Sequence, residues 1–322
     1  MCEKARNEKK FSLCVKKRIL FLYVSIEEGE IMRKSFIFLA MIAAVNAWAL
    51  TQNGVGVYQI GTCQDLKDFS DVVNTKEGTD SYPNAGANAE LTADIDMTTC
   101  GTINPIGAFR GNDDNSFTNN NSSNNFYSGH FAGNGHIISN LIVLKTRGPN
   151  IKVDGSTKEA YYAGLFGRVK EGVIEDVIVY NLEIDTKTNK DSYDYVGGIV
   201  GWLDNGSVLN CTIAGNSEIT GRRNVGGVVG RAEGGTIKDC LSNVQLSSTG
   251  RGANVYVGGI CGYASATTQL SSSVYVGSQI VRACVITDSC FCDEGGKSNE
   301  DVCKRDGTII PQYSYGVPPS NA

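Results

Sequence analysis

Aromatic side chains recur at one position of four similar phrases in the chain. Tyr161, Tyr195 and Tyr256 each open a phrase, and Asn224 opens the third of the four. Exposed, stacked aromatic rings are surfaces against which sugar rings pack, so these four residues are candidate binding residues. The alternative is an aromatic ladder that only stabilises the fold. We favour the ladder, because a binding platform would not be interrupted at its third step.

A second set of polar side chains also recurs at one position. Its members are Asn140, Asp176, Asn210 and Asp239. On adjacent coils such side chains would lie about 4.8 Å apart, which would suit a cation or a sugar. We favour a structural ladder in which they hydrogen-bond the backbone at a corner of the fold. The order Asn, Asp, Asn, Asp supports this interpretation, because two charges never fall on neighbouring coils.

A polysaccharide-degrading enzyme, a lyase or glycoside hydrolase, is the alternative function. Such an enzyme needs clustered carboxylates, or a calcium site beside a basic residue. Arg222, Arg223 and Arg231 precede Asp239 in the sequence, but no paired arrangement recurs there. We therefore expect no catalytic residue, no metal and no cofactor. An enzyme would use Asp176 or Asp239.

Nine cysteines follow residue 49, and an exported protein would hold most of them as disulfides. Cys63 and Cys100 are predicted to pair. Cys211 and Cys240 lie one repeat apart, where they can either bond or stack as reduced thiols. Cys261 occupies an apolar repeat position and is the expected free thiol. Two disulfides, rather than a zinc site, are expected among the remaining four, Cys284, Cys290, Cys292 and Cys303.

The fold that must position these residues is a repeat array. The phrases are residues 161–167 (YYAGLFG), 195–201 (YVGGIVG), 224–230 (NVGGVVG) and 256–262 (YVGGICG). A second phrase begins at Ile138, Ile174, Val208 and Ile237, with starts 36, 34 and 29 residues apart. Each period holds three short strands and no helix pattern, which predicts an all-β, right-handed parallel β-helix, or β-solenoid. The repeat itself does not determine the hand. The recurring glycine pairs indicate a coil corner where backbones approach closely.

The ends of a stacked array must be covered. Residues 62–65 (TCQD) have capping-box spacing, and Leu66, Phe69, Val72 and Val73 share one helical face, so a short N-terminal capping helix is expected. Asp94 and Asp96 should face solvent on the strand that follows. The predicted segments are an N-terminal cap with first strands (50–109), a polar loop (110–125), the solenoid (126–263), a cysteine-rich cap (264–310) and a flexible tail (311–322).

Residues 32–49 have the three parts of a secretory signal, with cleavage expected after Ala49. Residues 1–31 are expected to be an untranslated or disordered extension. The chain from residue 50 holds 20 Lys and Arg against 29 Asp and Glu, a net charge of −9. This acidic surface argues against nucleic acid as a partner, and no later apolar run is long enough to insert into a membrane.

The repeated phrases resemble the GLUG-motif repeats of bacterial surface and secreted proteins, and residues 162–167 (YAGLFG) match the motif itself. This resemblance, which extends over about residues 58–262, implies an extracellular β-solenoid of the kind found in adhesin-like proteins. Such repeats are also attached to IgA-cleaving zinc proteases. The protease part is missing here, because His130 and His136 do not form a His-Glu-x-x-His pair.

Signal, repeats and resemblance together predict a secreted or cell-surface, adhesin-like binding protein with polysaccharide or a surface protein as partner. A purely structural spacer is a further alternative. The sequence does not indicate an oligomeric state or a means of retention at the surface.

Overall fold

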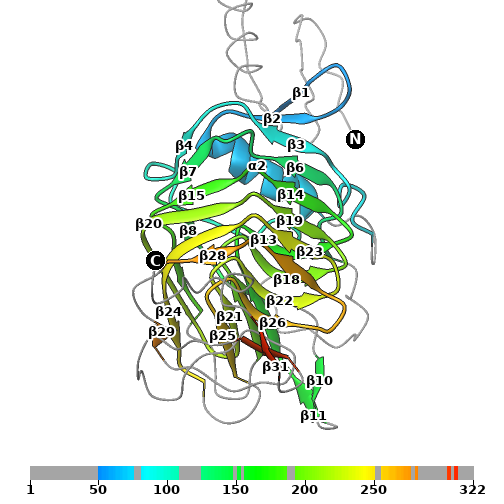
Figure 1. Ribbon diagram of the computed structural model, residues 1–322. Coiled ribbons are helices and arrows are strands. Elements are labelled where there is room, and N and C mark those ends of the chain that lie inside the picture. The colour runs from blue at the N-terminus through cyan, green and yellow to red at the C-terminus, as the bar shows by residue number, and fades with distance from the viewer. Residues whose placement is uncertain are drawn as a thin grey trace, which may run out of the picture. The chain divides into compact units, whose positions relative to one another are not determined.

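The computed structural model describes residues 50–75, 81–108, 125–147, 151–153, 156–186, 193–250, 255–276, 280–281, 303–305 and 308–310 (Figure 1). The chain divides into two units, Met1–Ala49 and Leu50–Ala322, and the described residues belong to the second. The predicted extension, signal and tail lie outside the described residues. So do nearly all of the polar loop and the side chains of the four cysteines from Cys284 to Cys303.

Four sheets form the solenoid. The first contains β1 (Thr51–Gln52), β2 (Tyr58–Ile60), β3 (Ala89–Leu91), β6 (His130–Ala132), β14 (Val173–Glu175), β19 (Ser207–Leu209), β23 (Thr236–Lys238) and β27 (Gln269–Ser271). The second contains β4 (Ile95–Asp96), β5 (Thr102–Ile103), β7 (Ile137–Ser139), β8 (Ile142–Val143), β15 (Ile178–Tyr180), β16 (Glu183–Asp185), β20 (Thr212–Gly221), β24 (Leu241–Ser248), β28 (Val274–Tyr275) and β29 (Ile280–Val281).

The third sheet contains β9 (Thr146–Arg147), β12 (Ala160–Ala163), β17 (Tyr193–Gly197), β21 (Asn224–Gly226) and β25 (Tyr256–Gly258). The fourth contains β13 (Phe166–Lys170), β18 (Val200–Asp204), β22 (Val229–Glu233) and β26 (Cys261–Ala264). Two separate hairpins pair β10 (Ile151–Val153) with β11 (Ser156–Lys158), and β30 (Cys303–Arg305) with β31 (Thr308–Ile310).

Successive coils stack in parallel and in register, which confirms the predicted β-solenoid. One coil runs through β17, β18, β19 and β20, and the next through β21, β22, β23 and β24 (Figure 1). Val200 pairs with Val229, and Val208 pairs with Ile237. The stacking continues through β27 and β28, beyond residue 263. The coils β17–β20 and β21–β24 have four strands each and the coil β12–β16 has five, rather than the predicted three, because the glycine-rich phrase breaks into two strands at its centre.

The glycines of that phrase allow close approach of backbones, as predicted. A Cβ on Gly226 would collide with the carbonyl oxygen of Val229 and would lie 2.7 Å from the nitrogen of Gly262. A Cβ on Gly230 would collide with the nitrogen of Val196. The colliding atoms belong to the backbone, so no side-chain rotation relieves the clash. Glycine is therefore required where the chain bends between the third and fourth sheets.

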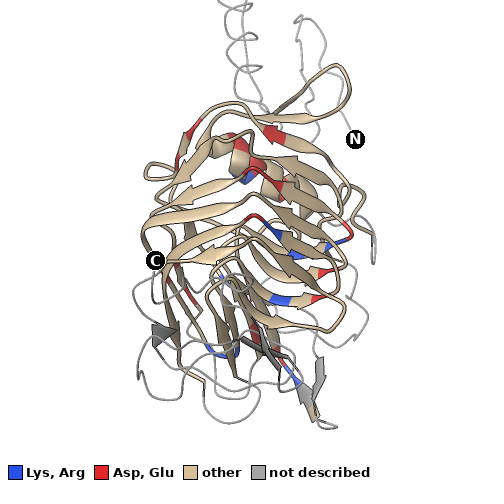
Figure 2. Cartoon of the chain, viewed as in Figure 1, with Lys and Arg blue, Asp and Glu red and all other residues tan. Residues whose placement is uncertain are grey.

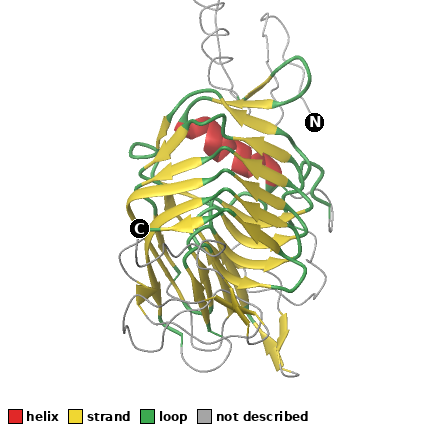
Figure 3. Cartoon of the chain, viewed as in Figure 1, coloured by secondary structure: helices red, strands yellow, loops and turns green. Residues whose placement is uncertain are grey.

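The predicted capping helix is α2 (Cys63–Val73), which lies across the N-terminal end of the coils (Figure 3). The Thr62 hydroxyl accepts from the Asp65 N–H (3.1 Å), and the Asp65 carboxylate accepts from the Thr62 N–H (3.0 Å), a complete capping box. Phe69 is fully buried and its ring lies 6.0 Å from that of Phe131. Among the described residues, no helix is long and apolar enough to cross a membrane.

The cysteine predictions have mixed outcomes. Cys63 and Cys100 form a disulfide, as predicted, and Cys261 is a buried free thiol, also as predicted. Cys211 and Cys240 are buried free thiols, so the bridged alternative is wrong. Stacking in register points both side chains the same way, and each thiol hydrogen-bonds a carbonyl at 3.3 Å instead. Burial raises the pKa of Cys211, which keeps its thiol protonated.

The predicted Asx ladder has one wrong member. Asp176, Asn210 and Asp239 all occupy left-handed corner positions, with φ between 48° and 55°. The Asn210 amide donates to the Asp176 carboxylate at 2.6 Å. The strand before Asn140 instead pairs with β15, which places Asn140 at another corner beside Asn181, at 3.1 Å. Similar sequence at two corners caused the error, since both require an Asx residue with positive φ.

Candidate functional site

Outward side chains of the third and fourth sheets meet at the glycine bend. Along β18 the core takes Leu203, while Trp202 points outward, as period-two alternation requires. Tyr195 points outward from β17, and its ring stacks on that of Trp202 with centroids 5.6 Å apart. Two residues on successive strands can touch in this way only where the outer surface is concave. The bend therefore gathers outward side chains into one cluster.

We call this set the elbow cluster. On the fourth sheet it comprises the register-matched row Arg168, Trp202, Arg231 and Tyr263. On the third sheet it comprises the row Tyr162, Tyr195, Asn224 and Tyr256.

Cations and rings alternate along the fourth-sheet row. The Arg168 guanidinium lies 4.2 Å from the Trp202 ring centroid, and Arg231 lies 4.2 Å from that of Tyr263. Tyr263 also contacts Tyr256 edge-on, with centroids 5.2 Å apart. Each cation–π contact contributes about 0.5–2 kcal/mol, depending on its exposure. The row thus links neighbouring coils from outside the core.

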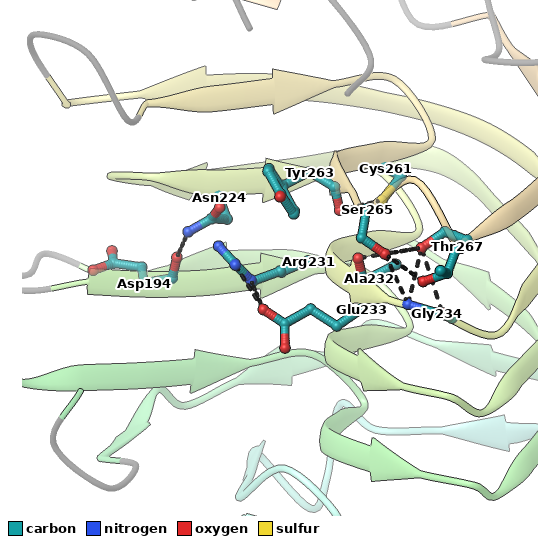
Figure 4. A network of polar contacts seen from close by, with 11 residues as sticks. Asp194, Asn224, Arg231, Ala232, Glu233, Gly234, Cys261, Tyr263, Ser265 and Thr267 are labelled. Atoms are coloured by element: carbon teal, nitrogen blue, oxygen red, sulfur yellow. Dashed lines mark hydrogen bonds and ion pairs between the residues drawn. The ribbon is translucent and has the colours of Figure 1, made fainter. Parts of the chain in front are cut away.

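Carboxylates lie next to the arginines. Arg168 binds Asp204 at 2.7 Å. Arg231 binds Glu233 at 2.6 Å, the pair that Figure 4 shows. The first pair is mostly covered, with side chains 11% and 17% exposed, whereas those of the second are 24% and 40% exposed. The part of the cluster that a ligand can reach is therefore around Arg231, Glu233 and Tyr263.

Several buried polar atoms of the cluster have no hydrogen-bond partner among the described residues. They include the Tyr162 hydroxyl, the Trp202 indole nitrogen and the Asn224 side-chain oxygen. Leaving such an atom unsatisfied costs about 1–3 kcal/mol. Burial also raises the pKa of Tyr195 to about 12. The cluster thus contains more buried polar atoms than its hydrogen bonds satisfy.

The four predicted binding residues do not all lie together. Tyr162, not Tyr161, pairs with Tyr195, because the first coil has one residue fewer at the bend: Tyr162 to Phe166 spans the same turn as Tyr195 to Val200. Tyr161 consequently faces the other way and donates to Glu159 at 3.1 Å. Tyr195 and Asn224 are buried, at 4% and 0% exposed, and Tyr256 is half-buried. The alignment of Tyr161 with the others was therefore wrong.

Asn224 interrupts the aromatic row because it makes a backbone contact. Its amide donates to the carbonyl of Asp194 at 3.0 Å (Figure 4). A tyrosine ring could not satisfy that carbonyl in the same buried space. The interruption therefore has a structural cause.

Sequence reasoning missed the fourth-sheet row, although a signal existed. Arg168, Trp202, Arg231 and Tyr263 each follow the last glycine of a repeat phrase. Their types differ, so no conserved letter marked the position. Only the alternation of inward and outward residues identifies it as a surface row.

A hydroxyl group network closes the last coil beside the cluster. The Gly234 N–H donates to the hydroxyls of Ser265 at 3.0 Å and Thr268 at 3.2 Å (Figure 4). These hydroxyls lie 3.1 Å apart. The network holds the backbone of the corner that follows Glu233. It thereby helps to position Glu233 in its ion pair with Arg231.

The carboxylates of the enzymatic alternative are corner residues. Asp176 and Asp239 lie on either side of Asn210, and Asp239 forms a 3.4 Å ion pair with the exposed Lys238. No group of three or more His, Cys, Asp or Glu within the described part of the chain is arranged to hold a metal ion.

Asp94 and Asp96 are exposed, as predicted, and the hydrogen bonds of Asp96 change the pKa of its carboxylate. Its carboxylate accepts from the Asn140 amide at 2.9 Å and the Thr98 hydroxyl at 2.6 Å. These hydrogen bonds lower the pKa of Asp96 to about 2, and the bond from Asn140 makes the largest contribution.

We expect an NMR titration of Asp96 to give a pKa about 2 units below the usual Asp value of about 4. Because the folded pKa is depressed, the ionised carboxylate stabilises this corner above pH 4, and that contribution disappears as the pH falls toward 2. Asn140→Gly keeps the positive φ but removes the donor, so it should raise the pKa of Asp96. An unchanged pKa in that variant would contradict the assignment.

Comparison with known proteins identifies the repeat. A family model, the GLUG motif, matches residues 192–220, which cover one coil from β17 into β20. No curated protein matches the sequence significantly. The chain is similar to the crystal structure of a candidate immunoglobulin A1 protease from Bacteroides ovatus, with 19% identity and a TM-score of 0.42 over 81% of this chain and 80% of that chain. The protein is therefore a parallel β-solenoid repeat protein that carries the GLUG motif.

Proposed function

We propose that the protein is a secreted, adhesin-like β-solenoid that binds a polysaccharide or a surface protein through its elbow cluster. The observation that carries this proposal is the outward row of alternating arginine and aromatic side chains on four coils. Trp, Tyr and Arg are the residues that dominate binding hot spots. In this proposal, the half-buried Tyr256 contacts the ligand, whereas the buried Tyr195 and Asn224 support the row.

The accessible part of the cluster suits either ligand class. Glu233 accepts hydrogen bonds and Arg231 donates them in a planar fork, which fits sugar hydroxyls and protein carbonyls alike. Tyr263 adds apolar area beside them. The ligand would thus meet two aromatic side chains, Tyr256 and Tyr263, and one ion pair at the surface.

Secretion is a separate part of the proposal and has its own test. Processing after Ala49 would leave Leu50 as the first residue of the exported protein. Mass spectrometry of the N-terminal peptide from culture medium or from the cell surface measures this directly. Recovery of peptides from residues 1–31 in the exported protein would contradict it.

Binding is tested by a glycan array and by retention on intact cells, before and after the cells are treated with protease or glycosidase. The treatments separate a protein ligand from a polysaccharide. We expect Tyr263→Ala to weaken the binding about 30-fold, the effect of losing a side chain worth about 2 kcal/mol. Arg231→Lys should also weaken it, because lysine lacks the planar fork that stacks on the ring.

Lys238→Ala is the matched control, since it removes an exposed side chain from the first sheet. It should bind as the unaltered protein does. Thermal unfolding of every variant separates loss of binding from loss of fold. If Tyr263→Ala and Arg231→Lys fold and bind normally, the elbow cluster is only a stabilising ladder.

A further inference from the structure

Exposed apolar side chains concentrate on one sheet. Among the described residues, six large hydrophobic side chains are exposed, and five lie on or directly beside strands of the second sheet. These five are Ile142, Leu144, Tyr180, Leu241 and Val276. Single exposed apolar residues are ordinary, but several on one face indicate an interaction surface.

Of these five residues, Leu241 also belongs to a register-matched row that crosses the sheet from coil to coil. Ile137, Ile178, Thr212, Leu241 and Val274 pair in sequence across β7, β15, β20, β24 and β28. All five are exposed or half-exposed, while their neighbours Ile138, Val179 and Ile213 are buried in the core. The row therefore presents four branched apolar side chains, together with Thr212, to the outside on successive coils. We call it the apolar row.

Carboxylates border the apolar row. Asp94 and Asp96 lie at its N-terminal end, where they line a hollow together with Ile137 and Tyr180. In Figure 2 this acidic end is red at β4, and the strands β7 and β15 beside it carry no charged residue.

Two further carboxylates face each other on neighbouring strands of this sheet. Glu183 pairs in register with Glu218, and both are exposed. Like charges on neighbouring strands repel, and neither carboxylate has an ion pair within the described part of the chain. None of the ten described strands of this sheet contains Lys or Arg. The strands of this sheet thus carry carboxylates but no Lys or Arg, and at its N-terminal end His136 lies 3.1 Å from Asp94.

We propose that the outer face of the second sheet docks a cationic protein segment with alternating apolar side chains. Apolar side chains of the partner would lie along the apolar row, and its Lys or Arg would reach Glu183, Glu218 and Asp96. Charge complementarity favours this occupant over a second copy of the chain. Two copies would bring together like borders on chains whose net charge from residue 50 is −9. This surface is distinct from the elbow cluster.

The test measures fluorescence anisotropy of three labelled twelve-residue peptides added to the full chain. One alternates Lys with Leu, one alternates Lys with Ser, and one alternates Glu with Leu. We expect only the Lys/Leu peptide to bind appreciably, and its affinity to fall with added salt. Equal binding of the Lys/Ser peptide would overturn the role of the apolar row.

Two kinds of variant separate the surface from general attraction to an acidic protein. Glu183→Gln with Glu218→Gln should weaken binding of the Lys/Leu peptide at least tenfold and reduce its salt dependence. Glu90→Gln with Glu171→Gln removes the same charge elsewhere and should leave binding within about twofold of the original. Equal effects of the two double variants would overturn the proposal.

Leu241→Ser tests the apolar row alone and should also weaken binding about tenfold, since a central apolar anchor is lost. Removing a like-charge repulsion should not lower the melting temperature of the Glu183→Gln, Glu218→Gln variant, so loss of fold is detectable. Sedimentation of the chain without peptide tests whether a second copy of the chain occupies this face. A dimer abolished by Leu241→Ser would show that a second copy covers this face and would overturn the proposal. Tyr263→Ala should leave peptide binding unchanged. A failure of the proposed function of the elbow cluster can therefore be distinguished from a failure of this proposal.

Discussion

Replacing Gly226 by alanine should lower the free energy of unfolding by about 3 kcal/mol, at the upper end of the cost of overpacking. The added Cβ would meet the carbonyl group of Val229 and the nitrogen of Gly262, 2.7 Å away. These are backbone atoms of the same coil and of the next, so relief requires two coils to separate. Chemical denaturation measured by circular dichroism gives the value.

Gly54→Ala is the control for this substitution. No atom lies within 4 Å of a Cβ built there. The same change in chemistry should therefore alter stability by less than about 1 kcal/mol, and can stabilise by restricting the unfolded chain. A similar loss in both variants would show that Gly226 is not a point of close backbone approach.

Phe69→Ala should cost about 4 kcal/mol, because it leaves a cavity in the closed end of the solenoid. The Phe69 ring packs 5.5 Å from that of Tyr58, 6.2 Å from Tyr127 and 6.0 Å from Phe131. These rings come from strands and loops that enclose the first coils. Loss of the ring removes contacts that no other residue of α2 can replace.

Val72→Ala is the comparison on the same helix. Val72 is half-buried rather than buried, so it lies at the edge of the helix face predicted from the sequence. Alanine also has the higher helix propensity, and we expect a change below about 1 kcal/mol. Equal losses from both substitutions would mean that α2 does not cap the core through Phe69.

Most of the architecture could be predicted because stacked coils share one periodic pattern. Residues such as Val200 and Val229 fill the same place on adjacent coils, so their recurrence reports parallel, in-register stacking directly. The capping box at Thr62 and the disulfide from Cys63 to Cys100 were likewise predictable, since each depends on local spacing or on few partners.

The errors arose where residues were aligned by their spacing in the sequence, whereas their partners on adjacent coils depend on strand pairing. The bend of the first coil is one residue shorter than that of the next, which displaced Tyr161 by one position, and one position moves a strand residue to the opposite face. Asn140 resembled the Asp176 ladder but belongs to another corner. Insertions in loops change the count without changing the coils, so sequence spacing alone cannot detect them.

That this chain is a solenoid follows from its sequence, because apolar periodicity and glycine recurrence are properties of each repeat. Which side chains share a surface follows from the folded coils alone. The elbow cluster brings Tyr195 onto Trp202 through a bend in the backbone, and the apolar row joins residues from five coils. Both depend on the path of the chain between strands. Repulsion between Glu183 and Glu218 becomes visible only when their strands are paired.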